Sequence, residues 1–302
     1  TTGDPLIKSL FQKLNTKNFE LIMQQLDNFC EIVEIFSDDK TLVPKIKAVS
    51  EKLKNSLIDA VKELHPEHVF KVPEEKSQAC IQFLQEYLNK NGLVFSTNYD
   101  LLLYWVLMRN GADNAIDGFG RDLETDLDDG HYVEPDDLEY SELRWGKYKE
   151  EQTVYYLHGT LPIFDTGINI VKAQYDEEHY LLQNVKDRID KKEYPIFVTA
   201  GNGKEKLTHI MHNKYLSFCY DQLCNIEGSL VTFGFNFGEY DTHIIDAINV
   251  AAKMGRKIPD KLWSVYIGVY SDENLKHIIE IKDKFKCKVT PYNARTANIW
   301  GT

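Results

Sequence analysis

The sequence predicts an α/β fold in which a parallel sheet is covered by helices on both faces. Short, almost entirely apolar runs recur along residues 91–302, and amphipathic helical stretches separate them. Strands that are apolar at nearly every position are typical of a parallel sheet buried on both faces. Residues 1–90 show only helical periodicity. We therefore divide the chain into a helical subdomain, residues 1–90, and a core that contains the sheet, residues 91–302.

The helical subdomain contains three stretches with helical periodicity. In residues 19–36 and 43–64, apolar side chains recur at three- and four-residue steps, which places them on one face of a helix. A third stretch, residues 77–89, stops before Asn91-Gly92, which is typical of a helix end. We expect three amphipathic helices here.

The core is expected to alternate strands with helices. Buried strands are predicted at residues 92–97, 154–158, 195–200, 229–235 and 262–268. Residues 288–292 favour an edge strand, because Pro291 cannot donate to a ladder. Helices fit between the strands at residues 100–110, 204–223, 241–254 and 273–285. In such sheets ligands bind beyond the carboxyl ends of the strands, so polar residues at those ends are candidates for the functional site.

An acidic, irregular segment interrupts the core at residues 121–142. A calcium-binding loop fails on spacing, because Leu127 would occupy a position that needs an oxygen ligand if Gly130 were the turn glycine. We interpret the segment as an acidic insertion, a loop or lid over the site.

Composition excludes several classes of protein. The formal net charge of −12 opposes binding to a polyanion, so we expect no direct contact with nucleic acid. No apolar run approaches the roughly 20 residues that cross a bilayer, and T-T-G-D-P does not resemble a signal peptide. The five cysteines form no C-x-x-C pair, which favours reduced thiols in a cytoplasmic protein.

The motif F-S-T-N-Y-D, residues 95–100, places several polar side chains at the end of the first strand. One of them can cap the next helix, which would be a structural role. Asn98 has both a donor and an acceptor to offer a ribose hydroxyl or a water. Capping accounts for only one of Thr97, Asn98 and Asp100, so a binding role stays open beside the structural one.

Two further motifs follow predicted strands. His158 comes after V-Y-Y-L, and Gly159 next to it would let a ligand approach closely; a histidine here suits proton transfer near neutral pH, or a hydrogen bond to a neighbouring loop. The loop G-F-N-F-G-E-Y-D-T-H-I, residues 234–244, offers backbone amides at Gly234 and a helix cap at Asp241 for an anion. The chain lacks zinc-hydrolase and serine-elbow signatures, so we expect no metal.

In this order, S-T-N-Y-D (96–100), L-H-G (157–159) and the loop 234–244 resemble the sirtuin-like superfamily, in particular its bacterial defence branch and a related family catalogued as of unknown function. N-F-E (18–20), F-V-T-A-G (197–201) with Lys206, and N-K-Y-L (213–216) add to the resemblance, which covers about residues 10–255.

The resemblance implies a Rossmann-like sheet that binds NAD and hydrolyses its nicotinamide–ribose bond. Asn98 would position water or the nicotinamide ribose, and His158 would act as a base or hydrogen-bond partner there. Gly234, Asn236 and Asp241 would hold the adenosine or phosphate side. Thr97, Asp100 and Gly159 would also contact NAD, which is then the substrate. The transition state resembles an oxocarbenium ion, so the site needs positioned polar groups rather than a strong nucleophile.

The resemblance has two departures. The family opens with a strand and a Gly-rich phosphate loop, which T-T-G-D-P does not match, so we expect residues 1–90 to lack that segment. The four-Cys zinc ribbon of the deacylases is also absent. We expect an NAD-depleting defence effector that works as a homo-oligomer or with a trigger-sensing partner protein. The alternatives are a non-catalytic sensor of NAD or ADP-ribose and an NAD-dependent transferase or deacylase.

Overall fold

The computed structural model describes residues 4–15, 19–64, 69–124, 139–140, 142–173, 181–191, 193–198 and 202–300. Its main elements are, in chain order, α1 (Pro5–Lys13), α2 (Phe19–Phe36), α3 (Leu42–Leu64), α4 (Glu74–Leu88), β1 (Val94–Ser96), α5 (Leu102–Arg109), β2 (Phe119–Gly120), β3 (Leu123–Glu124), β4 (Glu139–Tyr140), β5 (Leu143–Trp145), β6 (Val154–Tyr156), β7 (Gly159–Asp165), β8 (Ile170–Lys172), α6 (Leu181–Asp190), β9 (Pro195–Phe197), α7 (Gly203–His212), α8 (Lys214–Cys224), β10 (Gly228–Thr232), α9 (Thr242–Ala251), β11 (Leu262–Val269), α10 (Asp272–Ile281) and β12 (Lys288–Asn293).

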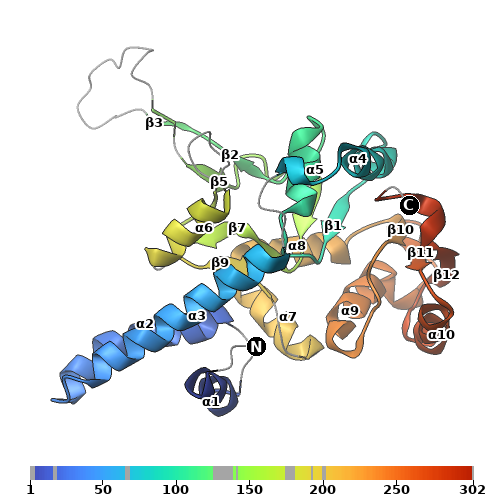
Figure 1. The fold of residues 1–302 in the computed structure, drawn as a ribbon. Helices are drawn as coiled ribbons and strands as arrows, with labels where there is room; N and C mark the ends of the chain where they lie inside the picture. The colour runs from blue at the N-terminus through green and yellow to red at the C-terminus, as the bar shows by residue number, and fades with distance from the viewer. Residues whose placement is uncertain are drawn as a thin grey trace.

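The chain has an α/β fold, as predicted. Helices α1–α3 extend to one side of the molecule, and the sheet β10–β11–β12 with α9 and α10 lies on the opposite side (Figure 1). β1 and β6 form a parallel pair, and β10, β11 and β12 form a parallel sheet. The predicted strands at 92–97, 154–158, 229–235, 262–268 and 288–292 correspond to these five elements. β12 lies at the edge of its sheet, as the proline in it predicts.

The three predicted N-terminal helices are confirmed as α2, α3 and α4. α2 packs against α3, and its residues Ile22, Leu26 and Val33 are buried on the predicted face. Phe29 and Phe36, which share the periodicity, are exposed. At 100° per residue, Phe29 and Phe36 both lie at one edge of the apolar face of α2. This apolar face is therefore wider than the part of α2 that is buried in the structure.

The helix predicted at residues 204–223 is two helices, α7 and α8. Asn213 separates them in an extended conformation, and its side chain accepts hydrogen bonds from the backbone N–H groups of Tyr215 and Leu216. Asparagine competes with the helix in this way because its side chain satisfies the free N–H groups at a helix start.

The strand predicted at residues 195–200 is present as β9. The prediction that it belongs to a parallel sheet is wrong. β9 pairs antiparallel with β7, in the sheet β2–β5–β8–β7–β9, which the sequence did not predict. The described part of the strand ends at Phe197, and residues 199–201 lie outside the described residues. A short apolar run indicates burial, but it carries no information about the direction of the neighbouring strand.

Most of the acidic segment 121–142, which we expected to form a loop or lid, lies outside the described residues, and so do Leu127 and Gly130 of the excluded calcium loop. The described parts of it include β3 and β4, which pair antiparallel with each other. Outside that pair, Asp122 forms an ion pair with Lys147 at 2.6 Å. Because β3 and β4 pair with each other, the two ends of the segment lie side by side.

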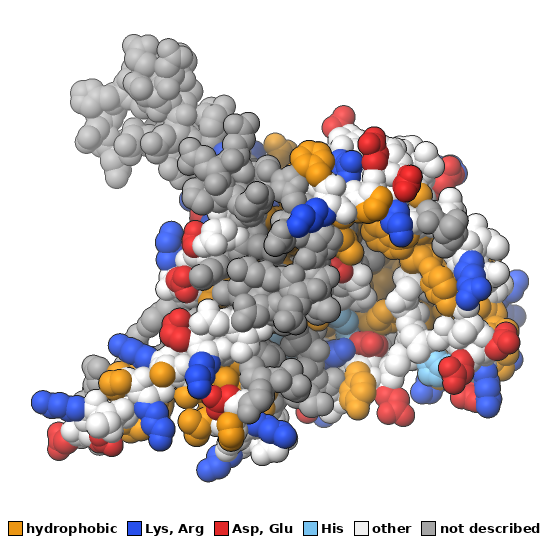
Figure 2. Space-filling model, viewed as in Figure 1, with side chains coloured by type: hydrophobic (Ala, Val, Ile, Leu, Met, Phe, Trp, Pro, Cys, Tyr) orange, Lys and Arg blue, Asp and Glu red, His pale blue; other side chains and the backbone are white. Residues whose placement is uncertain are grey.

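In the part of the chain that the structure describes, no helix is both long enough and apolar enough to cross a membrane. On the face in Figure 2, acidic and basic side chains are interspersed over the described residues. This distribution is compatible with the acidic net charge.

Candidate functional site

The two residues that we singled out first follow neighbouring strands. β1 and β6 are hydrogen-bonded in parallel, and their last register pair is Ser96 with Tyr156. Asn98 and His158 each come two residues after that pair. Since the two strands are parallel, both residues lie beyond the same edge of the pair, as the carboxyl-end rule predicts.

His158 is buried, with 5% of its surface exposed. Its Nε2 atom lies 2.8 Å from Nε2 of His243, and the two rings stack with their centroids 5.1 Å apart. Burial, and secondly the positive charge of Lys206, lower the pKa of His158 to about 4. Asp241 and a backbone hydrogen bond to Thr97 act in the opposite direction. His158 is therefore a neutral imidazole at pH 7.

His243 was not predicted from the sequence. It lies in the first turn of α9, directly after the loop that we expected to bind an anion, and is 1% exposed. The Tyr220 hydroxyl donates a hydrogen bond to its backbone carbonyl at 2.9 Å. Burial, and secondly repulsion from a charge on His158, lower the pKa of His243 to about 3. Its Nδ1 atom is buried and has no hydrogen-bond partner among the described residues.

A salt bridge lies beside this pair of histidines. Lys206 of α7 donates to Asp241 at 2.7 Å, and both side chains are largely buried. The starts of α7 and α9 approach closely here, because a Cβ atom on Gly203 would lie 2.0 Å from the Thr242 hydroxyl. The predicted residue Asp241 therefore belongs to the cluster, and Lys206 joins it from a second helix.

The donor atoms of His158, Asp241 and His243 lie within 4.8 Å of one another, which is compatible with a metal site. The ammonium of Lys206 already contacts the only carboxylate of this set and would repel a divalent cation. The two imidazoles also satisfy each other's Nε2 atoms. We interpret the cluster as a hydrogen-bond network suited to moving a proton.

The remaining residues of the first motif have structural contacts. Asp100 accepts a hydrogen bond from the backbone N–H of Leu102 at 2.9 Å, so it closes the turn at the start of α5. Asn98 is exposed, and its backbone N–H donates to the Ser96 hydroxyl at 3.1 Å. The Asn98 side chain is thus available at the surface beside the strand ends.

The loop after β10 divides into two parts. Gly234 has a φ of 69°, and a Cβ atom there would meet open space. The Asn236 side chain lies 3.5 Å from that of Asn274, and its backbone carbonyl lies 3.0 Å from the His277 ring, so this end of the loop contacts α10. The other end, at Asp241, reaches the histidine cluster.

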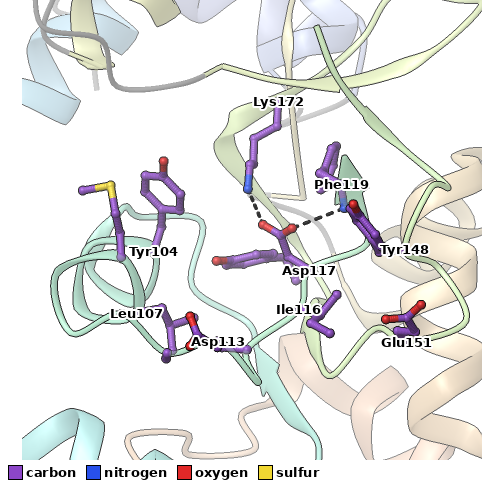
Figure 3. A pocket seen from close by; sticks show the side chains of 14 residues that line it. Tyr104, Leu107, Asp113, Ile116, Asp117, Phe119, Tyr148, Glu151 and Lys172 are labelled. Carbon is purple, nitrogen blue, oxygen red and sulfur yellow. Dashed lines mark hydrogen bonds and ion pairs between the residues drawn. The ribbon is translucent and has the colours of Figure 1, made fainter. Parts of the chain in front are cut away.

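A separate cavity of about 450 Å³ lies beside α5. Figure 3 shows Asp117 and Lys172 pointing toward each other in its wall, and Asp117 also accepts a hydrogen bond from the backbone N–H of Phe119. Apart from Tyr156, which precedes His158 by two residues, its lining is distinct from the motifs. No local sequence pattern predicts this cavity, because its walls come from distant segments.

The fold and the site define an α/β protein with a buried pair of neutral histidines beyond the ends of parallel strands. Residues 4–300 match the family described as Domain of unknown function (DUF4917), and the chain belongs to that family. No curated protein matches the chain.

Acid is expected to destabilise the protein through these histidines. Both folded-state pKa values are depressed below the ordinary value of 6.5. The unfolded chain therefore binds more protons, and stability is lost as the pH falls from about 6.5 toward 4. Each histidine contributes at most about 1.4 kcal/mol per pH unit. Urea unfolding at pH 7 and pH 5 should show a smaller pH dependence for His158→Gln than for the unaltered protein. An equal dependence would contradict the assignment.

Proposed function

We propose that the chain is an NAD⁺ glycohydrolase with a Rossmann-like NAD-binding core, related to the sirtuin-like superfamily. The observation that carries the proposal is the pairing of β1 with β6. It brings Asn98 and His158 to equivalent positions after neighbouring parallel strands. Their order along the chain is the order of the motifs in that superfamily.

The chemistry needs little more than positioned polar groups. Nicotinamide leaves from an oxocarbenium-like centre, and stabilising such a transition state depends on fixed dipoles and controlled water. In the proposal, Asn98 positions the water or the nicotinamide ribose, and the neutral imidazole of His158 serves there as base or as hydrogen-bond partner. Thr97, Asp100 and Gly159 lie beside them in the sequence, and the loop Gly234–Asp241, with Asn236, holds the adenosine or phosphate side.

The test measures nicotinamide release from NAD by the purified protein, alone and with candidate activators. We expect Asn98→Ala and His158→Ala each to lower turnover by about 10²- to 10⁴-fold, because each removes a group that acts on the reacting atoms. His212→Ala is the matched control, since His212 is an exposed histidine on α7. Unchanged turnover in both site variants would refute the assignment.

The same assay separates the competing functions. Binding of NAD without any release of nicotinamide, measured by calorimetry, would favour a sensor of NAD or ADP-ribose. Label from NAD on protein, in place of free ADP-ribose, would favour a transferase. In the proposal the enzyme is a cytoplasmic defence effector. Residues 1–90 and the acidic segment 121–142 serve its regulation by assembly or by a partner protein.

A further inference from the structure

Two contacts determine which nitrogen of His158 carries its proton. A backbone hydrogen bond to Thr97 raises the pKa of His158, which is the effect of an accepting carbonyl because it stabilises the protonated ring. Nε2 of His158 is already in contact with His243 at 2.8 Å. We therefore assign the Thr97 contact to Nδ1–H of His158. A neutral imidazole has one N–H and one lone pair, so Nε2 of His158 accepts and Nε2 of His243 donates.

This assignment leaves the lone pair of His243 on its Nδ1 atom. That atom is buried, and the described part of the chain provides no donor for it. Nearly all buried polar atoms of side chains have a partner, and an exception calls for an explanation such as a catalytic role. The ring is held in place, because it stacks on His158 at an interplanar angle of 30° and its backbone carbonyl accepts from Tyr220.

We propose that Nδ1 of His243 is the atom that takes the proton from the attacking water, and that His158 receives the charge through the hydrogen bond between the two Nε2 atoms. This inference rests on the proposed NAD hydrolysis. It makes His243 the catalytic base and His158 the second imidazole of a relay.

The step balances in atoms and charge. An O–H bond of water breaks, and its proton forms an N–H bond at Nδ1 of His243. The Nε2–H bond of His243 breaks, and that proton joins Nε2 of His158. The water oxygen bonds to the anomeric carbon of the ribose, while the C–N bond to nicotinamide breaks. Its electron pair stays on nicotinamide and neutralises the pyridinium, so the net charge lost by NAD ends on His158.

The backbone contact with Thr97 makes His158 the better place for that charge. Asp241 favours a protonated His158, and Lys206 opposes it. Both groups act on His243 in the same directions, so the difference lies in the Thr97 carbonyl, which accepts from His158, while Nδ1 of His243 has no partner among the described residues. A proton that enters at His243 therefore moves on to His158, where the Thr97 carbonyl stabilises it.

The deciding variant is His243→Gln. Glutamine keeps an N–H donor near the Nε2 position, so it can still orient His158, but it has no basic nitrogen. We expect kcat to fall by about 10²- to 10⁴-fold with an unchanged KM for NAD, and the double variant with His158→Gln to lose little more than either single one. His212→Gln is the control. Wild-type kcat in His243→Gln would overturn the proposal, because His243 would then only orient His158.

A second measurement needs no NAD and separates this inference from the proposed function. The ¹⁵N chemical shifts of histidine distinguish a protonated nitrogen from an unprotonated one, and the His243 signals are assigned by their loss in His243→Gln. An unprotonated Nδ1 with a protonated Nε2 supports the relay. A protonated Nδ1 overturns it, whether or not the protein hydrolyses NAD. A protein with the expected shifts that releases no nicotinamide would refute the proposed function and leave the assigned tautomers intact.

Discussion

Replacing Gly159 with alanine is expected to lower the free energy of unfolding by about 4 kcal/mol. Gly159 has a φ of 74°, a conformation that costs a residue with a Cβ atom about 1–2 kcal/mol. A Cβ atom there would also lie 1.9 Å from the backbone carbonyl oxygen of Ile196. That neighbour is part of the β9 backbone, so the ladder must shift, at a further cost of about 1–3 kcal/mol for overpacking.

Equilibrium unfolding in urea measures this loss, and Gly167→Ala is the matched control. Gly167 has a φ of 83°, but a Cβ atom there would meet nothing within 4 Å. It should cost only the backbone part, about 1–2 kcal/mol. If the two variants are equally stable, the close approach of β7 and β9 contributes nothing and the expectation is wrong.

Gly159 also has a structural role that the sequence did not reveal. Sequence reasoning placed it beside His158 so that a ligand could approach. In the structure the group that approaches most closely is the backbone of β9, whose pairing with β7 no local pattern revealed. The same region holds His158, because its carbonyl accepts a hydrogen bond from the backbone N–H of Val198. The glycine thus fixes the strand that positions the histidine.

The sequence was sufficient to predict that Asn98 and His158 follow parallel strands and lie beyond the same edge of them. Two apolar runs, each followed by a polar residue, predict parallel strands whose carboxyl ends meet at one edge. The structure pairs these strands directly. The rule worked because it depends only on strand direction and burial, which apolar runs encode.

The sequence was not sufficient to predict the partners of His158. His243 lies two residues after Asp241, which we had selected as a helix cap, and the carboxyl-end rule applied to β10 would have pointed to both. In the sequence His243 resembles any other histidine of a helix, because periodicity cannot say which turn of a helix faces a site. Lys206 entered only through the family resemblance, because its ion pair with Asp241 spans 35 residues.

Replacing Lys172 with methionine is expected to lower the free energy of unfolding by about 3–5 kcal/mol. Its ammonium forms an ion pair with Asp117, and only 10% and 18% of the two side chains are exposed. The ammonium also lies 5.2 Å from the ring centre of Tyr104 and 5.3 Å from that of Phe119. Methionine fills similar space but leaves the Asp117 carboxylate without its cation, and an unpaired buried charge carries a cost of this size.

Two comparisons make this expectation specific to the buried pair. Lys147→Met removes the cation from a more exposed ion pair with Asp122, where 35% and 67% of the side chains are exposed, and should cost far less, because solvent screens an exposed pair. Combining Lys172→Met with Asp117→Leu should recover much of the stability, because the charge that lost its partner is then gone. A Lys172→Met variant as stable in urea as Lys147→Met would show that water reaches Asp117 through the 450 Å³ cavity and solvates its carboxylate.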